Sequence, residues 1–236
     1  SIDGRLRENL HTIPEGRWLS LFNVRYLITD KLRDAWIDDV FYDLQHGARL
    51  SEGEGVQVPY VPRFEATALG LVSRLEGAVD LSDGAQVGTV RIGFESGAVQ
   101  TFELRAGEQV PGEAVDHAEL EDSTTRLPWA EPGRPLTVTL YATLPEGQWI
   151  VRGMSLIDER TGSFQSLVVS DRGRFRLVHS GDVKIYENLD VFPRAFVVPE
   201  SQVVRDDRAA LQEMQHSTFD PFSQVVLQAS GDSCSL

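Results

Sequence analysis

The segment VGTVRIGFESGAVQTFEL, residues 87–104, has the pattern of a β-hairpin. Val90, Ile92 and Phe94 alternate with polar or small residues, as expected for a strand that buries one face. The turn residues Glu-Ser-Gly-Ala follow at 95–98, and apolar residues then return in the second half of the segment. The segment therefore predicts a pair of antiparallel strands in the middle of the chain.

The neighbouring segments repeat this organisation. Apolar runs of strand length recur between turns that contain Gly or Pro, without the period of an amphipathic helix. Further candidate strands lie at 64–75, 136–140 and 149–157. We therefore predict a mainly β fold in which residues 51–170 form an inserted β-sandwich or jelly roll.

The terminal segments differ in character and predict a small α+β lobe formed from residues 1–50 and 171–236. A helix is indicated at 206–214, where Asp206 or Asp207 can cap a run of good helix formers. The other elements expected in the lobe are a helical turn or two after residue 14, strands at 24–29 and 40–50, a hairpin at 175–186, and short strands at 195–198 and 224–228.

Composition limits the classes of function. The chain has 236 residues, enough for a substantial core, and its net charge of −14 disfavours binding to nucleic acid. Cys234 is the only cysteine, so neither an intrachain disulfide nor a thiolate metal cluster can form. The polar start and the unpunctuated end predict that both ends of the sequence lie inside a longer protein.

Motifs of common enzymes are missing from the sequence. It contains no Gly-x-Ser-x-Gly, no glycine-rich phosphate loop and no pair of histidines at zinc-binding spacing. A pair of catalytic carboxylates leaves no signature in sequence, so a hydrolase stays open as an alternative. We expect a domain that is not itself an enzyme and that needs no cofactor.

Both ends of the chain carry a family resemblance. The segments are NVRYLI at 23–28, KIYEN at 184–188, FPRAFVV at 192–198 and FDP at 219–221, in that order. Together they resemble the extracytoplasmic C-terminal region of YfhO-type bacterial multi-pass membrane proteins, which are similar to glycosyltransferases that use polyprenyl-phosphate sugars. The resemblance implies a domain on the extracytoplasmic face of the cell membrane, with the membrane-embedded part of its own chain as partner. It carries over no catalytic residue.

Trp129 is a candidate for stacking on a sugar ring. It lies in the segment LPWAEPG at 127–133, and the prolines predict a loop rather than the interior of a strand. A tryptophan in such a loop is either an exposed platform or a plug over the end of the sandwich. Trp18, Trp36 and Trp149 have apolar neighbours and are expected in the core.

Arg172, Arg174 and Arg176 alternate and would share one face of a strand. Such a row suits an anionic headgroup or a lipid-linked sugar phosphate, although arginines on the outer face of a hairpin are as often plain surface.

The segment 107–122 is acidic and contains no basic residue. Its side chains, among them Glu119, Glu121 and Asp122, are hard oxygen ligands of the type that can hold a structural Ca²⁺. No Asp-x-Asp-x-Asp-Gly loop is present, and an exposed acidic loop is the alternative.

Two functions from different classes follow from these observations. The first is a non-catalytic extracytoplasmic domain that binds or positions a glycan or a lipid-linked saccharide for a membrane glycosyltransferase. The second is a structural or protein-interaction domain without a small-molecule ligand.

Overall fold

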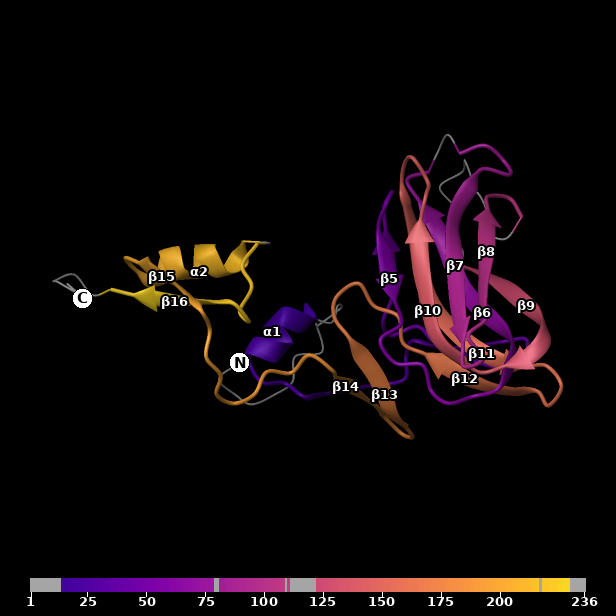
Figure 1. Ribbon diagram of the computed structural model, residues 1–236, viewed down its shortest axis with the longest axis horizontal. Helices are drawn as coiled ribbons and strands as arrows, with labels where there is room; N and C mark the ends of the chain where they lie inside the picture. Colours follow the sequence, from indigo (N-terminus) through magenta and orange to yellow (C-terminus); the bar gives the residue numbers. More distant parts are fainter. Residues whose placement is uncertain (1–13, 79–80, 109, 111–121, 217, 230–236) are drawn as a thin grey trace.

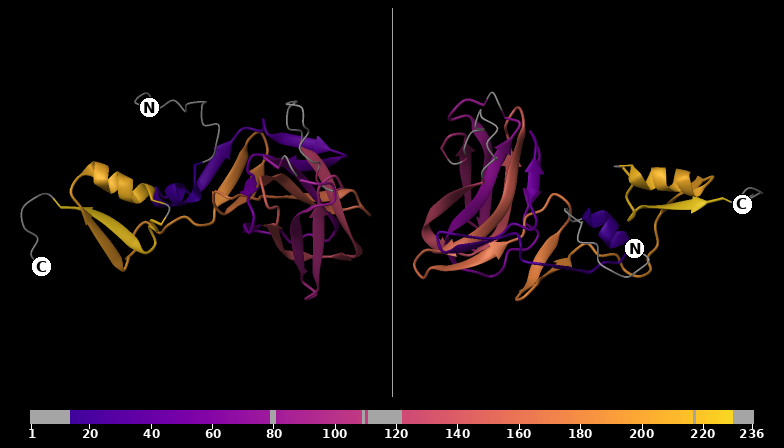
Figure 2. Two further views of the ribbon diagram at one scale, coloured as in Figure 1. Left: turned by 90° about the horizontal axis from the view of Figure 1, so that it is seen from above. Right: turned by 180° about the vertical axis from the view of Figure 1, so that it is seen from behind.

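The computed structural model describes residues 14–78, 81–108, 110, 122–216 and 218–229. Of these described residues, 51% are in strands and 7% in helices, so the fold is mainly β, which confirms the predicted fold class. Figure 1 shows a sandwich at one end, a small sheet with helix α1 beside it, and a β-α-β unit at the far end. The same elongated arrangement is seen from two other sides in Figure 2. In this described part of the chain, no helix has the length and apolar character needed to cross a membrane.

Two antiparallel sheets form the sandwich. One has the order β5 (Gly55–Gln57), β10 (Pro135–Ala142), β7 (Gln86–Phe94), β8 (Val99–Arg105). The other has the order β12 (Ser163–Leu167), β11 (Gln148–Asp158), β6 (Ala66–Glu76), β9 (Ser123–Gly133), with β4 (Ala48–Leu50) also paired to β11. The hairpin predicted at 87–104 is β7 and β8, and the three other candidate strands are β6, β10 and β11.

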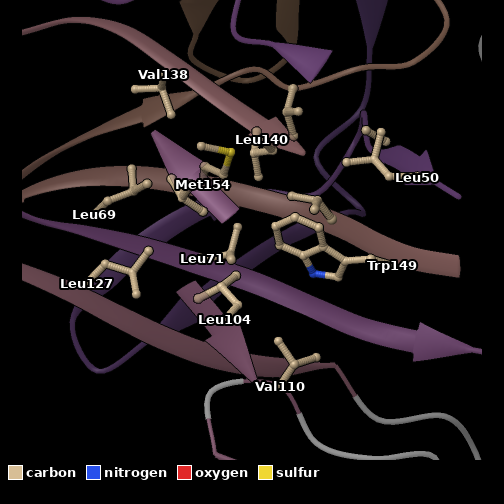
Figure 3. Packing of buried hydrophobic residues seen from close by; sticks show 14 of the residues in the cluster. Leu50, Leu69, Leu71, Leu104, Val110, Leu127, Val138, Leu140, Trp149 and Met154 are labelled. Atoms are coloured by element: carbon tan, nitrogen blue, oxygen red, sulfur yellow. The ribbon is translucent and has the colours of Figure 1, made fainter. Parts of the chain in front are cut away.

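The main core lies between these two sheets. Leu69 and Leu71 of β6 face Val90 and Ile92 of β7, and Trp149 of β11 fills the same layer with no exposed surface. Figure 3 shows Trp149 beside Leu71, among leucine and valine side chains from several strands. Each such side chain contributes about 1.5–3 kcal/mol through burial, so the alternation read from the sequence is the principal force that holds the sheets together.

Strand β9 differs from the sequence-based prediction. The segment expected to be a loop is instead an edge strand, in which Pro128 lies opposite Ala68. Proline is tolerated on an edge strand because its missing N–H can face away from the neighbouring strand. The register shifts between Ala66 and Ala68, which marks an irregularity in this pairing.

A hairpin of β2 (Asp34–Ile37) and β3 (Val40–Asp43) covers part of the outer face of the sheet that contains β6 and β11. Val40 and Tyr42 pack there against side chains of these two strands. The sequence predicted one strand at 40–50, but the chain leaves the hairpin after Asp43 and joins the sheet edge as β4. Residues 34–50, expected in the terminal lobe, therefore contact the sandwich.

Trp36 lies on the opposite face of this hairpin and is 67% exposed, so the prediction that it is a core residue is wrong. The alternation of β2 explains the difference, because Ala35 and Ile37 are the residues that pack toward the sandwich. Trp36 contacts Phe41 and Phe164 through its ring.

The two ends of the chain meet in a three-stranded sheet. Its order is β1 (Tyr26–Thr29), β14 (Lys184–Asn188), β13 (Phe175–Ser180), and helix α1 (Gly16–Leu21) packs beside it. Leu19, Phe175 and Tyr186 form its small core together with Val168. The pairing of the segments around 175–178 and 183–186 was predicted and is confirmed.

The C-terminal segment forms a β-α-β unit from β15 (Glu200–Val204), α2 (Asp207–Gln215) and β16 (Gln224–Gln228), with the two strands parallel. The predicted cap is confirmed, because Asp206 accepts a hydrogen bond from the backbone N–H of Ala209 at 2.8 Å. The strand expected at 195–198 is absent: these residues precede Pro199, and Phe196 packs on Phe192 instead of joining a sheet.

Candidate functional site

Three adjoining hollows lie between the sandwich and the small three-stranded sheet. We call them together the junction groove, defined by the two residues that line all three, Arg49 and Asp171. The large hollow measures about 690 Å³ and also contacts Gln57 and Arg174, and the outer hollow of about 540 Å³ contacts Arg17. The small hollow, of about 130 Å³, lies against β11. Figure 1 places β5, which lines the large hollow, on the side of the sandwich nearest β13 and β14.

Strand β4 positions Arg49. Ala48 and Leu50 point into the core, so the residue between them points outward, where its backbone lies opposite Ile150 of β11. Nη1 of Arg49 lies 3.2 Å from a carboxylate oxygen of Glu76. Arg49 of β4 and Arg152 of the paired strand β11 both line the small hollow.

The opposite wall is the segment 170–174, which crosses from β12 to β13. The backbone N–H of Arg49 donates a hydrogen bond to Oδ2 of Asp171 at 2.9 Å and ties the two walls together. Helix α1 supports the segment from behind, since the N–H of Gly16 donates to the carbonyl oxygen of Arg172. Gly173 has φ of 153° and lies so close to Gly16 that a Cβ on either residue would approach the other's backbone to 2.9 Å.

Charge in the groove is opposite to that of the whole chain. The small hollow is lined by Arg33, Arg49, Arg152 and Arg172, with Asp171 as its one acidic lining residue. The chain as a whole carries −14. Two of these arginines also have acidic partners outside the lining: Arg49 lies 3.2 Å from Glu76 and Arg152 lies 3.8 Å from Asp122.

Two of the three arginines predicted to bind an anion line this groove. Arg172 lines the small and outer hollows, and Arg174 lines the large one, where it also pairs with Asp190 at 3.0 Å. The prediction that all three share a strand face is wrong, because residues 172 and 174 precede β13. Arg176 is on β13, is not among the residues that line the three hollows, and pairs with Glu187 at 2.6 Å.

Glu187 also forms an ion pair with a second arginine, Arg25, at 3.1 Å. Hydrogen bonds from Arg176 and then Arg25 lower the pKa of the Glu187 carboxyl group. Arg176 also lies over the ring of Tyr60, 5.2 Å from its centroid. These contacts assign Arg176 to the support of the small sheet.

Trp129 is not a stacking platform, which corrects its candidate role as a ligand contact; of the two alternatives from sequence, the buried ring is the one observed. Its side chain is 8% exposed and belongs to the sandwich core. The indole N–H donates to the backbone oxygen of Ala66 at 2.9 Å, and the ring packs edge-on against Phe94. Because both the ring and its polar atom have partners, Trp129 stabilises the sandwich and presents no surface to a ligand.

The predicted calcium ligands are only partly described. Glu119 and Glu121 lie outside the described residues, and Asp122 lies 2.9 Å from Arg74 and 3.8 Å from Arg152. Two arginines beside this carboxylate neutralise the charge that a cation would need. In the described ranges, no three His, Cys, Asp or Glu side chains are grouped as metal ligands.

A buried ionic cluster joins the small sheet to the β2–β3 hairpin. Lys184 of β14 contacts Asp34 and Asp43, and the hydroxyl of Tyr186 donates to Oδ2 of Asp43 at 2.5 Å. Burial, followed by the charge of Asp43, raises the pKa of Tyr186. The ring of His46 packs against Tyr186 and Phe175. The cluster thus connects the small sheet to the hairpin that packs on the sandwich.

Arg49, Asp171 and Arg152 are site residues that sequence reasoning missed. The signal for Arg49 was local but weak: an arginine between two core residues in a short strand. No signal in the sequence marked Asp171 and Arg152. They come close to Arg49 only because β4 pairs with β11, about a hundred residues away in the chain.

No known family and no curated protein matches the chain. Among solved structures, it is similar to an active-site mutant of a family two carbohydrate esterase from Clostridium thermocellum, with 14% identity, a TM-score of 0.28, and coverage of 62% of this chain and 33% of the other. A family two carbohydrate esterase from Cellvibrio japonicus gives 8% identity, a TM-score of 0.27, and coverage of 83% and 41%. The chain therefore spans less than half the length of either structure.

Proposed function

We propose that this chain is a non-catalytic domain that binds a glycan or a lipid-linked saccharide in the junction groove. The observation that carries the proposal is the convergence of three hollows on Arg49 and Asp171. The large hollow, at about 690 Å³, has the size of a typical small-ligand site. Its lining combines planar hydrogen-bonding groups, such as Gln57 and Arg174, with apolar side chains such as Val56, a mixture that suits a saccharide.

Two acidic side chains of the groove are held in place by backbone hydrogen bonds. Asp171 accepts a hydrogen bond from the backbone N–H of Arg49 at 2.9 Å, and Glu54 accepts one from the N–H of Ser51 at 2.8 Å. Each carboxylate has a second oxygen that can accept a hydrogen bond from a hydroxyl group.

The wider setting of the domain is also a proposal. The resemblance of the segments at 23–28, 184–188, 192–198 and 219–221 to YfhO-type proteins supports an extracytoplasmic domain of a glycosyltransferase-like membrane protein. In that setting the groove would hold the saccharide while the membrane-embedded part of the parent chain carries out the transfer.

A glycan array followed by titration calorimetry tests the binding role. The variant Arg174→Gln should lower affinity for the best glycan about tenfold, because one charged hydrogen-bonding group is lost. Arg134→Gln is the control: this partly exposed arginine pairs with Glu95 at 3.4 Å and does not line the three hollows. Absence of binding across the array, or equal affinity of the two variants, would refute the proposal.

A structural or protein-interaction domain is the second candidate, and one observation favours it. Large apolar side chains are exposed mainly outside the sandwich, among them Phe22, Ile28, Leu32, Val197 and Phe222. Such surface often marks a protein contact. Under this alternative, changing Ile28 and Val197 to serine would remove the association of this domain with the membrane-embedded part of its parent chain. Arg174→Gln would leave any activity of the parent chain unchanged.

A further inference from the structure

We infer that the free edge of strand β16, the edge that faces away from β15, is a self-association surface on which a second copy of this chain pairs through its own β16. The two strands run antiparallel about a twofold axis at Val226 and give a four-stranded sheet in the order β15, β16, β16, β15. The inference does not rest on the proposed function, because β16 does not line the junction groove. It is carried by the backbone groups on this edge, by the lack of charge along it, and by an apolar hollow beside it.

The β15–α2–β16 unit buries little of its own surface. None of the residues of α2, β15 or β16 is buried. Parallel strands are ordinarily covered on both faces, and a sheet of two strands is marginally stable on its own. Figure 1 shows the unit at the end of the molecule away from the sandwich. A partner that extends the sheet would therefore stabilise the unit.

The hydrogen bonds to β15 identify the backbone groups of β16 that face the free edge. The carbonyl oxygen of Ser223, directly before β16, accepts from the N–H of Glu200 on β15. Because alternate residues of a strand turn their backbone groups to opposite sides, those of Gln224, Val226 and Gln228 face away from β15. No strand in the described ranges pairs with this edge, so it is open to an added strand.

These outward groups are complementary to themselves about a twofold axis. With Val226 on the axis, its N–H and C=O exchange two hydrogen bonds with Val226 of the second copy. Gln224 then lies opposite Gln228 of the second copy, and each Gln228 N–H donates to a Gln224 carbonyl oxygen. The N–H of Gln224 is not needed for these four bonds, and it already donates to the carbonyl oxygen of Asp220 at 3.0 Å.

The free edge lacks the features that usually keep edge strands apart. Residues 223–229 contain no charged side chain and no proline, whereas exposed edges commonly carry one or the other. The outer edge of β15 has both, because Pro199 directly precedes the strand and Glu200 begins it. In the antiparallel register of β16 no like charges face one another, so a second copy fits here although the chain carries −14.

Side chains on one face of the sheet support the same register. Val225 and Leu227 share a face and are 37% and 47% exposed. Val225 also lines an apolar hollow of about 220 Å³ together with Leu21 and Phe196. Leu227 of the second copy lies opposite Val225, beside this hollow, and the twofold axis repeats the contact. Burial of these side chains adds to the hydrogen bonds of the new strand pair.

Analytical ultracentrifugation of the whole chain between about 5 and 500 µM tests the inference. We expect an equilibrium between monomer and dimer with a dissociation constant in the micromolar range. No larger species should form, because a twofold contact is closed and the outer edges of the new sheet are those of β15. A monomer throughout this range would overturn the inference and leave the edge to a strand of another protein. A series of larger oligomers would overturn it equally.

Leu227→Lys should weaken dimerisation by about tenfold or more, because it places a charge against Val225 of the second copy. Val203→Lys is the matched control. Val203 lies opposite Leu227 in the parallel pair, on the same face, and is 63% exposed, but it belongs to β15 and lies away from the proposed contact. Equal dissociation constants for the two variants would contradict pairing through β16.

A pair of proline variants tests the backbone contact and serves if Leu227→Lys does not fold. Val226→Pro removes one outward N–H of β16 without removing a hydrogen bond to β15, and it should abolish the dimer. Val203→Pro likewise removes one outward N–H, from the opposite edge of the sheet, and should leave the dimer intact. Circular dichroism confirms that each variant is folded. Loss of the dimer in both folded variants, or in neither, would refute the inference.

Discussion

The Nζ atom of Lys184 lies 2.8 Å from Oδ1 of Asp43, and neither side chain is more than 1% exposed. Lys184 belongs to the three-stranded sheet and Asp43 to the hairpin on the sandwich, so this ion pair joins the supports of both groove walls. The cation also lies over the ring of Phe41, 5.6 Å from its centroid. A charge buried this completely is retained only where partners surround it.

Replacing Lys184 by methionine should destabilise the protein by about 3–5 kcal/mol, because Asp34 and Asp43 would lose their buried counter-ion. Urea unfolding measures the change. Lys31 is the one other lysine and provides the control: it is exposed and lies 3.9 Å from Asp34, so Lys31→Met should cost about 0–1 kcal/mol. Equal losses in the two variants would show that the buried pair has no special role.

Stability should rise with pH between about 4 and 6.5 because of His46. Burial lowers the pKa of this histidine from 6.5 to about 4, so in this window the unfolded chain binds a proton that the folded protein does not. As pH falls below 6.5, the free energy of unfolding decreases, because the unfolded chain gains a proton on His46 that the folded protein does not. The total loss is about 3 kcal/mol when the pH reaches the pKa of His46 in the folded protein. Urea unfolding across this range should give a shallower dependence for His46→Gln than for the exposed control His179→Gln. Identical slopes would contradict the assignment.

Gly173→Ala should destabilise the protein and weaken glycan binding together. A Cβ at this position would lie 2.9 Å from Gly16 Cα and 3.0 Å from the ring of Phe175, which forces the arginine-bearing segment outward. Gly162→Ala is the control, because Gly162 also has positive φ, 70°, but a Cβ added there would meet no atom within 4 Å. We expect the free energy of unfolding to fall by about 1 kcal/mol in Gly162→Ala and by about 1–3 kcal/mol more in Gly173→Ala. Thermal unfolding and calorimetry on the same samples separate the two effects.

Trp129→Phe should lower stability by about 1–3 kcal/mol and leave glycan affinity unchanged. The phenyl ring can still pack on Phe94, but the backbone oxygen of Ala66 loses its hydrogen-bond donor. Unfolding curves and a binding isotherm for the folded variant provide the measurement. A loss of glycan affinity with native stability would restore Trp129 as a ligand contact.

Local patterns predicted the sandwich well. The β7–β8 hairpin follows from alternation and from its turn, both of which lie within 87–104, and the capped helix α2 follows from Asp206 and the helix formers after it. Trp129 was misplaced because Pro128 is compatible with a strand when that strand lies at a sheet edge. Strand order is a property of the whole fold, so no segment alone reveals it.

The junction groove could hardly be predicted from sequence, because its residues come together only through non-local pairing of strands. Arg172 and Arg174 were identified as candidate anion ligands from their own sequence, but as members of one strand. Arg49 and Arg152 join them only because β4 pairs with β11 and the segment 170–174 passes beside this edge. The sequence could therefore suggest the chemistry of the site without its location.

An amide-resolved NMR titration with glucose tests most directly whether the junction groove binds a glycan. The account predicts shift changes concentrated at Arg49, along 55–59 and along 170–174, with the rest of the sandwich unchanged. Unchanged spectra up to ~10 mM ligand, a range that detects even weak millimolar binding, would contradict it. Changes confined to the exposed apolar surface around Ile28 and Phe222 would contradict it equally.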